Sequence, residues 1–154
     1  MLLLFLVIGT PIALTYSKTS FSESVKIPTR HIKVRQPVFT QKVAASVYFP
    51  SESQTDDSPR ITADGSRINK RHIKKQRWLA VSRNLLRKHK IRYGDSVYVS
   101  GINDELDGYY EVHDTMNKRL KNTIDILVGP NDNIMGHWKN VQLKKYKTVV
   151  LTEE

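Results

Sequence analysis

Hydrophobic and polar residues alternate along short stretches of the chain from residue 43 onward, and this period of two is typical of β-strands. The clearest stretch is 123–128, where isoleucines at 124 and 126 alternate with Thr123 and Asp125. A strand with this pattern buries the isoleucines and turns Asp125 to its other face. The further extended runs are residues 43–49, 78–82, 96–100, 108–114 and 141–146.

Glycines and Asn/Asp pairs separate these runs and predict tight turns, for example at Asp64-Gly65, Gly94-Asp95 and Asp107-Gly108. Residues 84–89 make the best short helix, because Leu85 and Leu86 are available to pack inward. About six short strands with one or two helical turns predict a mainly β fold, a small closed six-stranded barrel.

The start of the chain has a different character. Residues 2–14 are almost wholly apolar, which is too short for a comfortable membrane span of about 20 residues. Their length suits the apolar region of a secretory signal, and residues 15–17 offer a weak small-x-small cleavage site, although no basic residue precedes the leucines. Residues 1–17 are therefore predicted to be a signal peptide or N-terminal anchor, with export to the periplasm or cell envelope.

The remaining segments complete the predicted domain organisation. Residues 18–42 are rich in Ser, Thr and Lys with single prolines and no sustained period, so they are predicted to be a flexible linker. Residues 43–148 are predicted to form the barrel domain and residues 149–154 a tail. A chain of 154 residues holds one such domain with a leader.

Charge narrows the choice of partners. The net charge is +10, and residues 66–94 contain many lysines and arginines and no acid. Such a run can contact nucleic acid, a membrane surface or an anionic cell-wall polymer, and it can equally be a solvated face. Trp78 and Tyr93 are the only Trp, Tyr or Phe residues in this run, and they do not provide the aromatic spacing that base stacking needs. No nucleic-acid partner is expected, and membrane contact is expected only through residues 1–17.

The residue types present exclude several kinds of chemistry. The chain has no cysteine, so disulfides, thiolate zinc sites, a cysteine nucleophile and a lipoprotein cysteine are all excluded. Neither Gly-x-Ser-x-Gly nor Ser-x-x-Lys occurs, and the five histidines show no metal-binding spacing. His113 precedes Asp114, but neighbours on a strand point to opposite faces, which favours a structural or surface histidine. No metal or other cofactor is expected.

Carboxylate chemistry remains. Asp114 closes one extended run and Asp125 lies in the next, with a polar, basic loop between them. A carboxyl group in a partly desolvated cleft keeps its proton near neutral pH and can deliver it to a leaving oxygen. Such a group suits the cleavage of glycosidic bonds, where the bridging oxygen must be protonated. The pattern equally fits two strand-end aspartates without a catalytic role.

Several motifs resemble the three-aspartate (3D) domain, a double-psi β-barrel of bacterial cell-wall proteins that also occurs in membrane-bound lytic transglycosylase A and rare lipoprotein A-like proteins. Ser46-Val47-Tyr48 resembles the opening strand of this domain, and residues 61–66 resemble its Thr-Ala-x-Gly turn. Asp114-Thr115 followed by Thr123-Ile124-Asp125-Ile126 is similar to the Asp-Thr-Gly-Gly…Arg-Ile-Asp signature. The resemblance extends over residues 43–146.

The resemblance implies a lytic transglycosylase-like enzyme that cleaves the MurNAc–GlcNAc backbone of peptidoglycan glycan strands, and we expect it to act as a monomer. It implies that Asp125 is the general acid and that Asp114 lies across the cleft. The substrate-binding residues that it implies are Thr62, Asp64 and Thr115, which would hydrogen-bond the sugar, and Trp138 or Tyr48, which would offer a stacking face. Trp138 equally fits a core residue at the end of the barrel.

The chain also departs from the 3D pattern. Ser82 stands where the first of the three aspartates is expected, and Met116-Asn117 replaces the Gly-Gly of the signature. These departures leave a non-catalytic wall-binding barrel as the alternative. A basic nucleic-acid-binding protein is a third hypothesis, based on residues 66–94.

Overall fold

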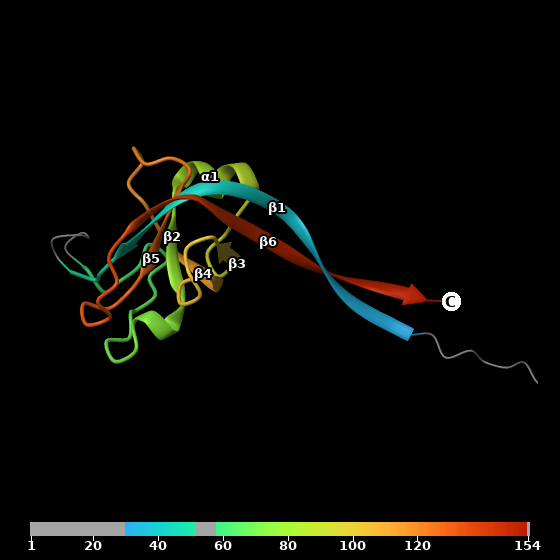
Figure 1. Cartoon of the computed structure of the whole chain (residues 1–154), viewed down its shortest axis with the longest axis horizontal. Coiled ribbons are helices and arrows are strands. Elements are labelled where there is room, and N and C mark those ends of the chain that lie inside the picture. Colours follow the sequence, from blue (N-terminus) through green and yellow to red (C-terminus); the bar gives the residue numbers. More distant parts are fainter. Residues whose placement is uncertain (1–29, 52–57, 154) are drawn as a thin grey trace, which may run out of the picture.

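The computed structural model describes residues 30–51 and 58–153 (Figure 1). The chain runs through β1 (Arg30–Tyr48), a short 3-10 helix η1 (Lys74–Gln76), β2 (Trp78–Val81), α1 (Arg83–His89), β3 (Ser96–Ser100), β4 (Gly108–Thr115), β5 (Thr123–Leu127) and β6 (His137–Glu153). The predicted strands and the predicted short helix are therefore confirmed, with different bounds for β1 and β6.

The six strands close into a barrel in the order β1-β5-β2-β4-β3-β6. The pairs β1–β5 and β2–β4 are parallel, and the four other pairs are antiparallel. Closure leaves no strand of the barrel wall with an unpaired edge. The predicted mainly β fold, a six-stranded closed barrel with a short helix, is confirmed.

Aliphatic side chains from all six strands fill the barrel interior. Leu79 of β2 and Ile124 and Ile126 of β5 are each 0% exposed. The alternation predicted for β5 is thus observed. A second, smaller apolar cluster contains Tyr48, Ile68, Ala80, Met116 and Leu127. Ala80 and Leu127 each follow an interior residue on their strand, so this cluster covers the outer side of the barrel wall.

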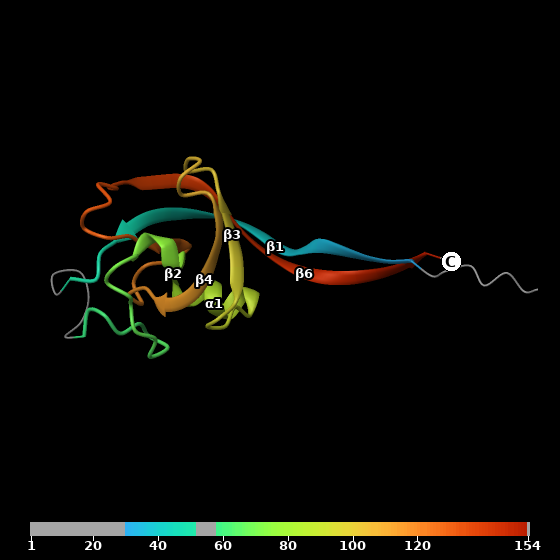
Figure 2. The same cartoon turned by 90° about the horizontal axis from the view of Figure 1, so that it is seen from below.

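Beyond the barrel, β1 and β6 continue together as a two-stranded antiparallel ribbon (Figures 1 and 2). Its register begins with Arg30 opposite Glu153. The linker prediction is therefore wrong for residues 30–42, and the tail prediction is wrong for residues 149–153. Residues 30–42 and 149–153 belong to β1 and β6, which pair with each other through their backbones. Pairing between segments so far apart in the chain cannot be recognised from the local pattern of hydrophobic and polar residues. A register shift after Pro37 accommodates the missing proline N–H.

No helix within the described residues is long and apolar enough to cross a membrane. The predicted leader at residues 1–17 and the linker residues 18–29 lie outside the described residues.

Candidate functional site

Asp125 lies on β5, with β1 on one side and β2 on the other. Its register partners are Ser46 on β1 and Ala80 on β2. Because Ile124 and Ile126 fill the interior, Asp125 faces outward, as its alternation predicted. The Ser46 hydroxyl donates a hydrogen bond of 2.9 Å to Asp125 Oδ1. The carboxyl group is therefore held by a rigid strand and by a side chain on the neighbouring strand.

Asp114 lies on the other side of Ala80, which is also its register partner in the β2–β4 pair. The two aspartates are thus separated by a single strand, which places their Cα atoms about 10 Å apart. Asp114 Oδ1 accepts hydrogen bonds from the backbone N–H groups of Ala63, at 3.1 Å, and Thr115, at 2.7 Å. The small side chain of Ala80 leaves the space between the two carboxyl groups open.

A groove of about 590 Å³ opens over this part of the wall, and we refer to it as the aspartate groove. Its lining includes five of the seven predicted site residues: Tyr48, Thr62, Asp114, Thr115 and Asp125. Two carboxyl groups, a phenol and two threonine hydroxyls therefore border one space. Such a mixture of donors and acceptors suits a polyhydroxylated ligand.

Burial is the main influence on the pKa of the Asp125 carboxyl group. It raises the pKa of the Asp125 carboxyl to about 6, against the lowering effect of the Ser46 hydrogen bond, and the nearby charge of Asp114 adds to the rise. The outer apolar cluster, with Tyr48, Ala80 and Met116, supplies apolar surroundings on this side of the wall. A carboxyl group with this pKa still carries its proton in part of the molecules near neutral pH, as a general acid must.

Tyr48 borders the aspartate groove, but its ring and its hydroxyl oxygen are both buried. The residue is only 7% exposed, so the ring packed in the outer apolar cluster offers no open stacking face. Burial raises the pKa of the Tyr48 phenol well above its ordinary value, and the charges of Asp114 and Asp125 add to this effect. The phenol therefore stays protonated, and hydrogen bonding to Asp114 adds to the rise in its pKa.

Asp64 does not line the aspartate groove and instead braces the turn that carries Thr62. Its Oδ1 accepts hydrogen bonds from the Thr62 hydroxyl, at 2.6 Å, and the Ser66 N–H, at 2.9 Å. Its Oδ2 lies 2.7 Å from His113 Nδ1. Burial acts to raise the pKa of Asp64, but hydrogen bonds from Thr62, Ser66 and His113 outweigh it and lower the pKa to about 2. Asp64 is therefore a positioning residue.

His113 and Trp138 both lie in packed surroundings. The His113 ring is buried and stacks against Trp78, with ring centroids 4.0 Å apart. This agrees with the structural histidine that the strand pattern favoured. Trp138, on β6, packs against the barrel core and does not line the aspartate groove. Its indole covers Gly136, where a Cβ atom would meet the ring at 2.5 Å. Its position therefore fits a core residue and not the predicted stacking face.

Ser46 and Ala80 are the site residues that sequence reasoning missed. Both are small residues on other strands, and only the register of β1 and β2 brings them beside Asp125. Ser82, which stands where the first of the three aspartates is expected, is 0% exposed. Its Oγ accepts a hydrogen bond of 3.2 Å from the Thr123 N–H, so it joins the end of β2 to the start of β5.

Asp125 and Asp64, whose pKa values are shifted in opposite directions, should make opposite contributions to the pH dependence of stability. Because folding raises the pKa of Asp125 from 3.8 to about 6, ionising this group costs the folded state up to ~3 kcal/mol once the pH exceeds both values. Asp125→Asn should therefore increase the free energy of unfolding at about pH 8 by roughly 1–3 kcal/mol and change it little below about pH 4. Urea unfolding at the two pH values measures this difference.

Asp64→Asn is the matched control. The pKa of Asp64 is lowered, so its contribution to stability is present above pH 3.8 and is lost as the pH falls through about 2. This variant should be destabilised at about pH 8. If Asp125→Asn changes stability equally at both pH values, burial of the charged carboxylate is not the cause.

In the part of the chain that the structure describes, no group of three or more His, Asp or Glu side chains is arranged to hold a metal ion. No protein-family model matches the sequence, and no curated protein matches it either. The resemblance to the 3D domain therefore depends on the motifs themselves and on their agreement with a six-stranded barrel.

Proposed function

We propose that this protein is an exported, peptidoglycan-active enzyme that cleaves the MurNAc–GlcNAc backbone in the manner of a lytic transglycosylase. The observation that carries the proposal is Asp125, a carboxyl group on a rigid strand with a pKa of about 6, in the aspartate groove that Asp114 also lines. The resemblance of the Asp114-Thr115 and Thr123–Ile126 motifs to the 3D signature supports the same activity.

In this mechanism Asp125 acts first as an acid and then as a base. Its protonated carboxyl group donates to the glycosidic oxygen while the bond between that oxygen and C1 of muramic acid breaks. The C6 hydroxyl of the same sugar then attacks C1 and closes a 1,6-anhydro ring, and its proton passes to the Asp125 carboxylate. One residue serves both steps because the nucleophile belongs to the substrate. No water is consumed, and the acid is regenerated.

The neighbouring residues have distinct roles in this proposal. Ser46 orients the Asp125 carboxyl group through the 2.9 Å hydrogen bond. The Asp114 carboxylate, fixed by two backbone N–H groups, would stabilise positive charge that develops at C1. Thr115, which lines the groove, would hydrogen-bond the sugar, whereas the Thr62 hydroxyl is held by Asp64 and supports the turn beside the groove.

Incubation of the full chain with purified sacculi, followed by mass spectrometry of the soluble products, tests the proposal. Release of anhydro-muropeptides is the expected result. Binding to sacculi without any released fragment would favour the alternative, a wall-binding barrel, which the departures at Ser82 and Met116-Asn117 motivate. Binding to DNA with a steep salt dependence and no affinity for the wall would contradict both. The proposed location requires the protein to fractionate with the cell envelope and not with the cytoplasm.

Ser46→Ala should move the pH profile of cleavage. The Ser46 hydrogen bond lowers the pKa of Asp125, so its loss should raise that pKa above about 6. Because cleavage needs the protonated carboxyl group, the decline of the rate on the alkaline side should shift to higher pH by several tenths of a unit to about one unit. Initial rates of muropeptide release from about pH 4 to 9 provide the measurement.

Ser96→Ala provides the control for this shift, since Ser96 is an exposed serine on β3 and lies outside the aspartate groove. Its profile should coincide with that of the wild type. An unchanged profile for Ser46→Ala would mean that the ionisation of Asp125 does not govern the rate.

A further inference from the structure

The fold divides the basic run of residues 66–94 into charges that support a loop and charges that border open hollows. The Arg77 guanidinium donates hydrogen bonds to the carbonyl oxygens of Glu105, at 3.0 Å, and Asp107, at 2.7 Å, and lies 3.9 Å from the centroid of the Tyr110 ring. Lys74 Nζ lies 2.6 Å from Glu105 Oε1. These two cations therefore hold the loop before β4 and are not available to a ligand.

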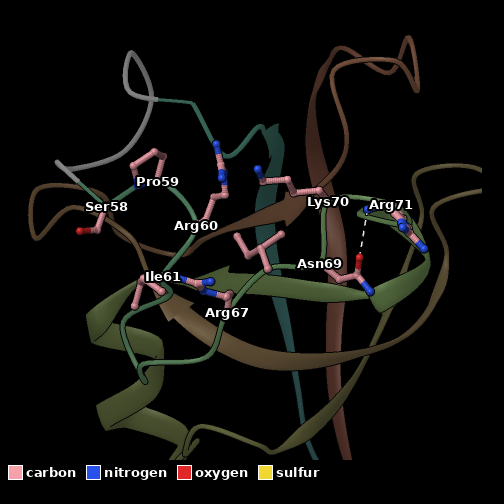
Figure 3. Close-up of a pocket in the computed structure, with 9 residues that line it drawn as sticks. Ser58, Pro59, Arg60, Ile61, Arg67, Asn69, Lys70 and Arg71 are labelled. Atoms are coloured by element: carbon pink, nitrogen blue, oxygen red, sulfur yellow. Dashed lines mark hydrogen bonds between the residues drawn. The ribbon is translucent and has the colours of Figure 1, made fainter.

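Four other cations border one hollow of about 750 Å³, which we refer to as the first basic hollow (Figure 3). They are Arg60, Arg67, Lys70 and Arg71. All four side chains are exposed, and among the described residues no carboxylate lines the hollow or pairs with them. Figure 3 shows the charged end of Lys70 extending toward that of Arg60. Like charges that converge in this way repel until an anion lies between them.

Local pairing holds the walls of the first basic hollow in place. Ile61 and Arg67 form an isolated antiparallel bridge, and the Ile68 N–H donates to the Arg60 carbonyl at 2.9 Å. The side chain of Asn69 accepts a hydrogen bond of 3.0 Å from the Arg71 N–H. The arginines therefore extend from a backbone with defined contacts.

A second basic hollow, of about 690 Å³, is lined by Arg83 and Arg87 of α1 and by Lys118 and Lys121 of the loop between β4 and β5. Here too, no carboxylate lines the hollow among the described residues. Two segments far apart in the sequence thus contribute cations to one surface, which is difficult to explain as a simple solvated helix face.

The aspartate groove lies between the two hollows. It shares Ile61 and Ile68 with the first basic hollow, and Ala63 and Thr115 with the second. A long ligand that occupies the aspartate groove can therefore continue into a basic hollow on either side. The turn of residues 62–66, braced by Asp64, joins the bridged residues Ile61 and Arg67, both of which line the first basic hollow.

We propose that the two basic hollows are subsites for carboxylate groups of a glycan polymer, on both sides of the sugar that occupies the aspartate groove. This inference rests on the proposed function for the identity of the polymer. Arginine pairs well with carboxylates because its planar guanidinium offers two parallel donors. Nucleic acid fits less well, because no aromatic side chain lines the first hollow and Tyr93 is the only one among the described residues that line the second.

Binding measurements with the full-length Asp125→Asn variant test the proposal, since this variant leaves the polymer intact. The probes are glycan strands with their peptides, the same strands after an amidase has removed the peptides, and neutral chitin oligosaccharides of equal length. Carboxylated strands should bind at least about tenfold more tightly than the neutral oligosaccharides. Because the amidase hydrolyses the amide between the lactyl group and the peptide, it removes the peptide carboxylates and frees one lactyl carboxylate on each muramic acid. A loss of affinity after this treatment assigns the subsites to the peptide carboxylates, and retained affinity means that a free lactyl carboxylate also satisfies them.

Charge removal at each hollow provides the second comparison. The combined variants Arg60→Gln/Arg67→Gln/Lys70→Gln and Arg87→Gln/Lys118→Gln/Lys121→Gln should each weaken binding of carboxylated strands by about tenfold to hundredfold. Binding of the neutral oligosaccharides should not change. The matched control removes three exposed lysines outside all three spaces, by Lys33→Gln/Lys139→Gln/Lys147→Gln.

Three results would overturn the inference: equal affinity for neutral and carboxylated strands, an equal loss in the control variant, or tighter binding of duplex DNA than of the glycan. The outcomes also separate this inference from the proposed function. Binding that depends on both hollows, together with a wild type that releases no fragments, refutes only the cleavage activity. If the wild type cleaves the glycan but neither charge-removal variant binds it more weakly, only the carboxylate subsites are refuted.

Discussion

Asp125→Asn should reduce the release of anhydro-muropeptides from sacculi by a factor of about 10²–10⁴ while the barrel remains folded. Asparagine keeps the size of the side chain and can still accept the hydrogen bond from Ser46, which is 2.9 Å long in the native site. It has no proton to transfer to the glycosidic oxygen and cannot accept the proton of the C6 hydroxyl. Mass spectrometry of timed digests measures the loss, and circular dichroism checks the fold.

Two further variants make this result specific. Asp114→Asn should lower the rate less, because Asp114 acts through its charge and not by proton transfer. Asp104→Asn, at an exposed loop position away from the aspartate groove, should leave the rate unchanged. Digestion at the wild-type rate by both Asp125→Asn and Asp114→Asn would exclude the carboxylate mechanism.

Leu79→Ala should have the largest effect on stability, a loss of about 2–5 kcal/mol in the free energy of unfolding. Leu79 is 0% exposed and lies on β2, opposite Val112 of β4 and Ile126 of β5. Its replacement leaves a cavity in the barrel core beside the strand residue, Ala80, that aligns the two aspartates. Equilibrium unfolding in urea or guanidinium chloride measures the change.

Leu151→Ala makes the same chemical change on the ribbon, where the leucine is 46% exposed. Removing this side chain should cost no more than about 0.5–1 kcal/mol, because much of it already contacts water. Similar losses for the two variants would mean that the barrel interior is not the main source of stability.

The barrel strands and the outward direction of Asp125 could be predicted from the amino-acid sequence alone. These features depend on local properties: the alternation of Ile124 and Ile126 with Asp125 requires only the period of a strand, and glycine or asparagine at the turns requires only local backbone geometry. For the same reason, the short helix was predictable from Leu85 and its neighbours. All of these agree with the burial pattern of the structure.

Which residues contact one another could not be predicted in this way, because it depends on how distant strands pair. Ala80 brings Asp114 and Asp125 to either side of one strand through the registers of two strand pairs, and a register is set by pairing between distant segments. The part of β1 in the ribbon could not be predicted, because most of its side chains are at least partly exposed and hydrophobic and polar residues do not alternate along it. The same holds for the basic residues. Their number and spacing could be read from the sequence, but only the folded structure shows that Arg77 supports a loop while Arg60 and Lys70 border an open hollow. Local preferences select strands and turns, whereas the position of each charged side chain depends on contacts that form only when the barrel closes.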